Sequence, residues 1–349
     1  MDVLPSHADF DPLPAEDAER EAVIRRDSGF HLRPPPAPHL LDSFITEDDG
    51  LFQTIHMGAA HIDHQKWRLV VTGLVFHPFF LSLAQLKALP TKTITSFHEC
   101  FGSPLKPATS ALWRVGNVRW TGVSLKLLLD TAQASEHATF VWSEGLDSGQ
   151  FGGIEADRYQ KDLPMEKALQ DDVLIAWEMN GQPLSVRRGG PVRLVVPGWF
   201  GTNSVKWLSK ITVQDRRSPS HFTTTFYNEH HPPDDPACES RPVWKAQPNS
   251  LISRPVPQSR LEGPEVAIEG WAWSNEGVAS VNASSDEGKT WVEAAIDPRE
   301  DFSWQRFRAV LHLPKGERTV LAKATGADGR TQSLVIGRNH VHRVKFEVL

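Results

Sequence analysis

Apolar residues recur at helical spacing in three short stretches of the first two thirds of the chain. Residues 82–89 and 123–130 each place leucines three or four positions apart, and each contains a serine that can cap the first helical turn. Pro90 ends the first of these stretches, because proline cannot continue a helix. A third, shorter helix is predicted for residues 165–169.

Strand patterns occur in the same part of the chain. The runs at 67–73, 192–196 and 210–214 are rich in valine, leucine, isoleucine and threonine, which is typical of β-strands. The pair Asn180-Gly181 indicates a tight turn. Helix and strand patterns therefore mix between about residues 51 and 225.

The rest of the chain has a different character. Residues 256–349 contain almost only β patterns, with short alternating runs such as 265–269 and 279–284 between turn clusters. Short strands at this spacing predict an Ig-like sandwich. Two proline-rich stretches flank the mixed region, and we expect 1–50 to be an N-terminal arm and 226–255 to be a linker or wrapping segment.

Composition narrows the classes of function. The 349 residues carry a formal net charge of −6, which argues against nucleic-acid binding because that needs a basic surface. No apolar run reaches the roughly 18 residues that cross a bilayer, and the acidic N-terminus lacks a signal-peptide pattern. We therefore expect an intracellular, soluble protein. Two cysteines, Cys100 and Cys238, exclude a disulfide framework and a four-thiolate metal cage.

Cys100 is the first candidate for chemistry, since the common nucleotide-binding and hydrolase motifs are absent. It follows an alternating apolar run, so it lies where a strand is predicted to end and can project into a cleft. A buried, inert cysteine fits this pattern, and so does a thiolate that ligates a transition metal or acts as a nucleophile. His56, His61 and His64 form a weak metal-site pattern, with ordinary solvent-facing or core histidines as the alternative.

The stretch 187–207 places cations beside glycine-rich turns around an apolar strand. These cations are Arg187, Arg188, Arg193 and Lys206. Cations next to glycine-rich backbone can cradle an anionic group such as a phosphate, whereas a solvated charged rim is the alternative. Tyr159 and Arg119 are further candidates, for which a hydrogen bond to a bound oxyanion and a packing role both stay open.

Taken in order, these segments closely resemble the sulfite oxidase family of molybdenum-cofactor enzymes. The strings that carry the resemblance after Cys100 are WRVGNVRWTGV at 113–123, DDVLIAWEMNGQPL at 171–184, GPVRLVVPG at 190–198 and SVKW at 204–207. Three further strings resemble the Ig-like dimerisation domain of that family: GWAW at 270–273, SDEGKTW at 285–291 and NHVHR at 339–343. The resemblance covers about residues 50–349.

The resemblance implies a mixed α+β domain at 51–225 that binds molybdenum through a pterin dithiolene, followed by an Ig-like sandwich at 256–349. Cys100 would be the protein ligand of the metal, and the implied catalytic residues are Tyr159, Cys100 and Arg119. The implied cofactor-binding residues are His56, Cys100, Asp147, Arg188, Arg193, Ser204, Val205 and Lys206. Arg188 stands where the family usually has a histidine, and a guanidinium also binds phosphate.

The implied activity is transfer of an oxygen atom to or from a small sulfur-containing substrate by a homodimer. No haem is expected because no CxxCH motif or haem domain is evident, so electrons would pass to or from an external partner. The chain departs from the family near the substrate. Arg-Asn-His of the family is Thr54-Ile55-His56 here, and Cys-Ala-Gly-Asn-Arg-Arg is replaced by the sequence of residues 100–105.

These departures leave neutral residues where the family has arginines. Either Lys106 or Arg114 compensates for the lost charge, or the substrate is larger or less anionic, such as an organic sulfur compound or a sulfoxide. A different class of function is the alternative to an enzyme: a non-catalytic scaffold that keeps the fold.

Overall fold

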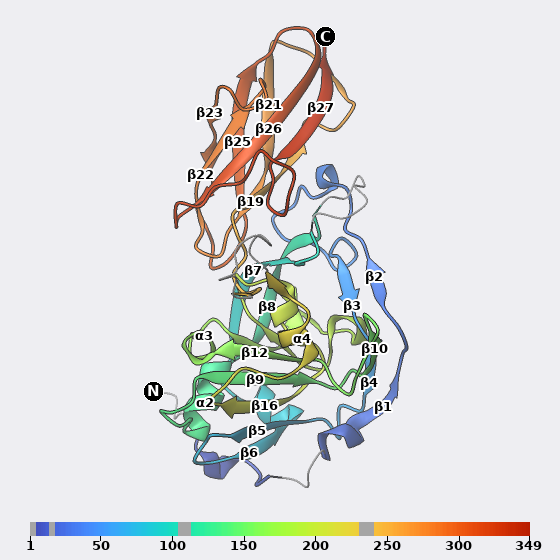
Figure 1. The fold of residues 1–349 in the computed structure, drawn as a ribbon, viewed down its shortest axis with the longest axis vertical. Helices are drawn as coiled ribbons and strands as arrows, with labels where there is room; N and C mark the ends of the chain where they lie inside the picture. The colour runs from blue at the N-terminus through green and yellow to red at the C-terminus, as the bar shows by residue number, and fades with distance from the viewer. Residues whose placement is uncertain (1–4, 14–17, 104–112, 230–240) are drawn as a thin grey trace, which may run out of the picture.

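The computed structural model describes residues 5–13, 18–103, 113–229 and 241–349. Figure 1 shows a larger body of strands and short helices, with a smaller all-β body stacked on it at the C-terminal end. The chain therefore has the predicted class, a mixed α+β domain followed by a β-sandwich. No helix in the described ranges is long and apolar enough to span a membrane.

Two sheets form the larger domain. The first has the order β12-β9-β16-β5-β6, with β5 and β16 parallel. Its strands are β5 (Arg68–Gly73), β6 (Phe79–Ser82), β9 (Phe140–Gly145), β12 (Gln160–Pro164) and β16 (Leu208–Gln214). The second has the order β14-β13-β8-β7, and β15 also pairs with β13. Its strands are β7 (Lys92–Glu99), β8 (Val115–Ser124), β13 (Leu174–Met179), β14 (Gln182–Pro183) and β15 (Arg193–Val195).

Short helices and strand pairs complete this domain. The α-helices are α1 (Leu83–Lys87), α2 (Leu125–Ala132), α3 (Met165–Ala168) and α4 (His221–Thr224). The 3₁₀ turns are η1 (His7–Asp9), η2 (Ala18–Ala22), η3 (Pro38–Leu40), η4 (Val186–Arg188) and η5 (Gly201–Asn203). The paired strands are β1 (Val23–Arg26) with β4 (Ala60–Ile62), β2 (His31–Arg33) with β3 (Gln53–Ile55), β10 (Gly149–Phe151) with β11 (Ile154–Ala156), and β17 (Asn228–Glu229) with β18 (Arg241–Pro242).

The local signals in the sequence explain several of these elements. Ser82 caps α1, because its side chain accepts a hydrogen bond from the Gln85 N–H while the Gln85 side chain accepts one from Ser82. Ser124 is the N-cap residue of α2, although its side chain makes no capping hydrogen bond. Asn180 and Gly181 both have positive φ angles, 54° and 73°, as a tight hairpin turn between β13 and β14 requires. The predicted helices and the Asn-Gly turn are therefore confirmed.

The C-terminal domain consists of two facing sheets. One has the order β19-β21-β25-β24 and the other β20-β27-β26-β22-β23. Their strands are β19 (Asn249–Arg254), β20 (Arg260–Leu261), β21 (Glu265–Trp273), β22 (Val278–Ser284), β23 (Val292–Glu293), β24 (Ala295–Ile296), β25 (Gln305–His312), β26 (Gly316–Gly326) and β27 (His342–Val348). Apolar side chains from both sheets, such as Ile268, Phe307 and Val320, are fully buried between them.

Strand β19 corrects the predicted start of this domain. Residues 226–255 were expected to be a linker, but β19 pairs with β21 and so belongs to the C-terminal sheet. The proline-rich composition of the segment hid a six-residue strand at its end.

The two domains are joined by a buried, aromatic interface. Trp271 and Trp304 of the C-terminal domain stack with ring centroids 4.6 Å apart. Their indole N–H groups donate to main-chain carbonyls of the N-terminal arm, Trp271 to Leu41 at 2.6 Å and Trp304 to Phe44 at 2.9 Å. The arm therefore packs between the domains at this point. Its strands β1 and β2 pair with β4 and β3.

Glu99, the last residue of β7, is buried in this interface. One carboxylate oxygen accepts from Asn249 at 3.0 Å and the other from the indole of Trp273 at 2.9 Å. The orientation of Asn249 is fixed, because its Oδ1 accepts from the amide of Gln332, whose own Oε1 accepts from the Ala324 N–H. Both oxygens of Glu99 therefore face N–H groups that can only donate a hydrogen bond. Burial raises the pKa of Glu99 to about 7, while these two donors act to lower it.

We expect Glu99→Gln to weaken the contact between the domains. The amide group of glutamine would place a donor against a donor, and an unsatisfied buried polar group costs about 1–3 kcal/mol. The measurement is urea unfolding followed by tryptophan fluorescence, with the exposed Glu265→Gln on β21 as the matched control. An unfolding midpoint equal to that of the control would contradict this account of the interface.

Candidate active site

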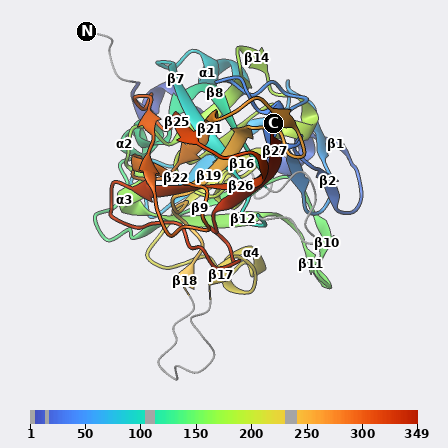
Figure 2. The same ribbon diagram turned by 90° about the horizontal axis from the view of Figure 1, so that it is seen from above.

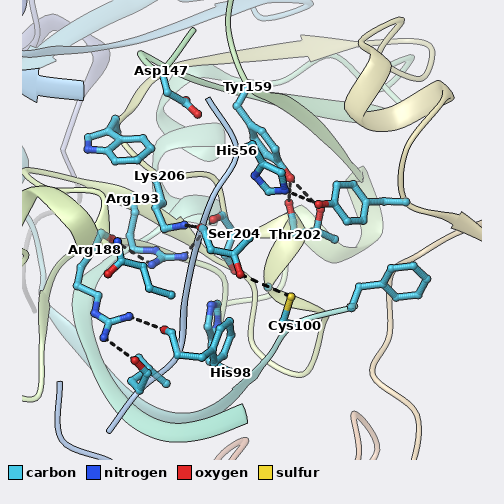
Figure 3. A pocket seen from close by; sticks show the side chains of 18 residues that line it. His56, His98, Cys100, Asp147, Tyr159, Arg188, Arg193, Thr202, Ser204 and Lys206 are labelled. Atoms are coloured by element: carbon cyan, nitrogen blue, oxygen red, sulfur yellow. Dashed lines mark hydrogen bonds between the residues drawn. The ribbon is translucent and has the colours of Figure 1, made fainter. Parts of the chain in front are cut away.

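A pocket of about 700 Å³ lies in the larger domain, where β7 ends beside β3, β15 and η5. Figure 3 shows side chains from distant parts of the chain pointing into it. Eight of the predicted residues line this pocket: His56, Cys100, Asp147, Tyr159, Arg188, Arg193, Ser204 and Lys206. The structure therefore gathers most of the predicted set around one cavity.

Cys100 is the only cysteine in the described ranges, and it lies just beyond β7. Its N–H donates to the Arg114 carbonyl at 2.8 Å, and its own carbonyl accepts from the Ser103 N–H at 3.2 Å, so a tight turn fixes the residue. Because side chains alternate along a strand, His98 and Cys100 share the pocket face while Glu99 points to the C-terminal domain. The Sγ atom lies 3.9 Å from the hydroxyl of Thr54.

Three cations line the side of the pocket away from the cysteine. Arg193 of β15 donates to the carbonyls of Arg188 and Ser204, at 3.0 and 3.1 Å, and its guanidinium lies over the ring of Trp120 at 4.9 Å. Lys206 Nζ donates to the carbonyl of Thr54 at 2.6 Å. Desolvation and the charge of Arg193 lower the pKa of Lys206 to about 7. Of the three, Arg188 alone has a carboxylate ion pair in the described residues, with Asp48 at 2.6 Å.

A close backbone approach holds two of these cations side by side. Gly189 follows η4 with a φ angle of +93°, and a Cβ atom there would lie 2.6 Å from the Cβ of Lys206. Only glycine fits this position, because a side chain would collide with Lys206 and strain the backbone. The Arg-Arg-Gly-Gly sequence thus brings Arg188 beside Lys206.

Asp147 is buried at the edge of the same cation group. Its Oδ1 atom has no hydrogen-bond partner among the described residues. Burial raises the pKa of Asp147 to about 7, and the nearby charge of Lys206 opposes that rise. A buried carboxyl oxygen without a partner is a strong acceptor for a ligand N–H group.

The two tyrosines of the chain both line the pocket. The Tyr159 hydroxyl donates to the carbonyl of Thr202 at 2.8 Å and also contacts the Thr202 side chain. Tyr227, which lies after α4, contacts His56 Nε2 through its hydroxyl. Burial raises the pKa of both tyrosines, so both remain protonated hydrogen-bond donors near neutral pH.

Sequence reasoning missed Tyr227, because it lies in the segment expected to be a linker. It belongs to none of the motifs that the sequence analysis singled out. Desolvation lowers the pKa of its partner His56 to about 3, so that imidazole is neutral.

Arg119 and Val205 do not line the pocket. Arg119 is exposed on β8, because its neighbours Val118 and Trp120 face inward on the alternating strand. Its prediction as a catalytic residue is therefore not supported by its position. Val205 is fully buried, and its carbonyl accepts from the Leu194 N–H to hold β15 in place.

The other candidates from the sequence also lie apart. Arg187 and His64 are exposed, and His61 pairs with Asp27 at 3.0 Å. In the part of the chain that the structure describes, no group of three or more His, Cys, Asp or Glu side chains can hold a metal ion.

Arg114 and Lys106 were the two candidates to replace the missing arginines. Arg114 is buried behind the turn at Cys100, where its Nη2 donates to the Gly102 carbonyl at 2.5 Å, and it does not line the pocket. Its charge still reaches the pocket, because it contributes to lowering the pKa of His56. Lys106 lies outside the described residues.

Comparison with known proteins identifies two domains in this chain. Residues 56–222 match the model of the oxidoreductase molybdopterin binding domain, and residues 240–333 match the Mo-co oxidoreductase dimerisation domain. Mitochondrial sulfite oxidase of Rattus norvegicus is 32% identical over 89% of this chain and 61% of its own length. Sulfite oxidase of Gallus gallus is 30% identical over 85% of this chain and 70% of its own length.

A solved structure is similar over nearly the whole chain. The sulfane dehydrogenase SoxCD from Paracoccus pantotrophus superposes with a TM-score of 0.78 and 27% identity, covering 99% of this chain and 90% of that chain. The chain spans about three fifths of the length of the mammalian relatives that it matches. With matches to both domain models and to sulfite oxidases across most of its length, the chain belongs to the sulfite oxidase family of molybdopterin-binding oxidoreductases.

Proposed function

We propose that this protein is a molybdopterin-dependent oxidoreductase that moves an oxygen atom to or from a small sulfur-containing substrate. The observation that carries the proposal is the meeting of a single thiol, three cations and two tyrosine hydroxyls around one pocket. A scaffold that only kept the fold would need none of these groups, and buried charges are costly to keep without a ligand.

The residues of the pocket fit a molybdenum–pterin group. Cys100 would ligate the metal, because a thiolate is a suitable soft ligand for it. Arg188, Arg193 and Lys206 would hold the anionic part of the pterin, and the unpartnered oxygen of Asp147 would accept from its ring N–H groups. When bound, this group supplies two-electron redox chemistry and oxygen-atom transfer.

The protein's own contribution would be to orient the substrate. Tyr227 is protonated and lies against neutral His56. When the Nε2–H of the imidazole donates to the Tyr227 oxygen, the Tyr227 hydroxyl can donate to a substrate oxygen. Tyr159 is anchored to Thr202 and packs beside His56, with ring centroids 5.2 Å apart, which holds the imidazole in place.

A specific observation favours a less anionic substrate than sulfite as a second candidate. Two neutral side chains form the wall beside Cys100: the hydroxyl of Thr54 lies 3.9 Å from the sulfur, and Phe101 lines the same pocket. Each charge-assisted hydrogen bond that is missing there weakens oxyanion binding by about 1.5–3 kcal/mol. An organic sulfur compound or a sulfoxide suits this wall better.

We also propose that the protein acts as a homodimer and exchanges electrons with an external partner. The match of residues 240–333 to a dimerisation domain supports the first part. The second part is supported by the match to a molybdopterin-binding oxidoreductase domain, since a redox reaction at a bound cofactor has to exchange electrons with a partner.

The test is to purify the protein from a host that makes the pterin cofactor. We expect close to one molybdenum and one pterin per chain, and turnover of at least one compound from a panel of sulfite, thioethers and sulfoxides. Metal analysis, pterin fluorescence after oxidation, and steady-state assays measure these. Protein free of both molybdenum and pterin would overturn the proposal, while efficient oxidation of sulfite at low substrate concentration would rule out the less anionic substrate.

A further inference from the structure

A second, wider cleft adjoins the active-site pocket. It measures about 1600 Å³ and shares Phe101 with the pocket, so this ring forms the boundary between them. Its walls come from both domains: β17 and β18 contribute one side, and Arg330 and Arg338 of the C-terminal domain contribute another. Figure 2 shows β17, β18 and α4 together on one side of the molecule.

The side chains that line the cleft carry a net positive charge, although the whole chain has a net charge of −6. Four cations line it, and Glu229 is the one carboxylate among its described lining residues. The cations are Arg241, Lys245, Arg330 and Arg338. Lys245 and Arg330 have carboxylate partners, Glu276 at 2.9 Å and Asp328 at 3.5 Å, which do not themselves line the cleft. Within the described ranges, no carboxylate pairs with Arg241.

Arg338 is held at the boundary between the two cavities. Its guanidinium lies 3.4 Å from the centroid of the Phe101 ring. Its Nη1 donates to the carbonyl of Phe101 and, at 3.3 Å, to that of Ser103, and its Nε lies 3.5 Å from Glu229. Carbonyl groups fix the position of a guanidinium without cancelling its charge. In the described structure no contact engages Nη2, so one donor group of this arginine stays available.

We propose that this cleft binds the anionic end of an elongated organosulfur substrate, while the sulfur end lies in the inner pocket beside Cys100 and Tyr227. The ligand class is a small organic sulfur compound with a carboxylate or sulfonate several bonds from the sulfur. This inference deepens the proposed function and rests on it.

The division of charge between the cavities supports this assignment. The wall of the inner pocket is neutral at Thr54 and Phe101, and its own cations lie on the far side, whereas four further cations stand beyond the Phe101 ring. A small inorganic oxyanion held against Thr54 and Phe101 would contact no charged side chain of that wall, but a longer molecule would reach Arg338 and Arg241 in the cleft. Arginine suits such an end group, because its planar fork binds a carboxylate through two parallel hydrogen bonds.

The test compares two probes of equal length: an aliphatic sulfoxide with a terminal carboxylate, and its methyl ester. Binding to the holoenzyme is measured by titration calorimetry, separately from turnover. We expect the acid to bind at least about tenfold more tightly than the ester. Arg338→Met and Arg241→Met should each remove most of this preference and leave ester binding unchanged, while Arg343→Met, outside the cleft, should keep it.

The outcomes separate the two proposals. Equal binding of acid and ester, or equal losses for both probes in the variants, would overturn the assignment of the cleft even if the enzyme turns over sulfur compounds. Arg338→Met keeps an apolar stem over Phe101, and Arg241 is exposed, so one of the two variants remains informative if the other unfolds. Selective binding of the acid by an enzyme that transforms no sulfur compound would instead contradict the proposed function.

Discussion

Replacing Cys100 by serine is expected to reduce turnover by at least about 100-fold. Changes to groups that only support a metal ligand already cost about 10–100-fold, so losing the proposed ligand itself should cost at least as much. Serine keeps the size of the side chain but offers a hard, neutral hydroxyl in place of a soft thiolate. The measurement is steady-state turnover together with the molybdenum and pterin content of the purified variant.

The pterin content should fall less than the activity. The cations that would hold the anionic part of the pterin lie at the end of η4, on β15 and after η5, and the substitution does not touch them. Cys238→Ser, at the other cysteine of the chain, is the matched control and should behave like the wild type. A Cys100→Ser variant with full molybdenum content and full turnover would falsify the assignment of Cys100 as the metal ligand.

The residues that could be predicted are those whose signal is local in the sequence. Cys100 follows a strand with clear alternation, and the pocket cations Arg188, Arg193 and Lys206 all lie within a stretch of glycine turns and one apolar strand. In such segments the backbone itself decides where the side chains point. The resemblance to a family then predicted that these residues bind the same cofactor.

The residues that could not be predicted reach the site through long-range packing. Tyr227 contacts His56 across 171 positions of sequence, and its φ angle of 58° is unusual for a residue other than glycine. Arg338 enters from the other domain. Arg119 lies outside the pocket for a different reason, because a one-residue step along a strand moves a side chain to the opposite face.

Lys206 gives the second large effect, a pH dependence of stability in the cofactor-free protein. Its pKa is lowered from 10.5 to about 7 in the folded state. Between these values the unfolded chain holds a proton that the folded chain lacks, so the free energy of unfolding rises as pH increases from 7 to 10. A shift of this size corresponds to about 4–5 kcal/mol at most, and we expect on the order of 2 kcal/mol because the side chain is partly exposed to the pocket.

Lys206→Met should remove most of this rise and make the cofactor-free protein more stable than the wild type at pH 7, whereas Lys210→Met on β16 should preserve the wild-type profile. Lys161, whose pKa burial lowers to about 8, adds a smaller rise between pH 8 and 10 that both variants retain. Thermal unfolding at pH 7, 8.5 and 10 measures the effect. Added pyrophosphate, which favours the charged form of Lys206, should stabilise the wild type more at pH 7 than at pH 9. An unchanged pH profile in Lys206→Met would mean that the pKa of this lysine is not lowered in the folded protein.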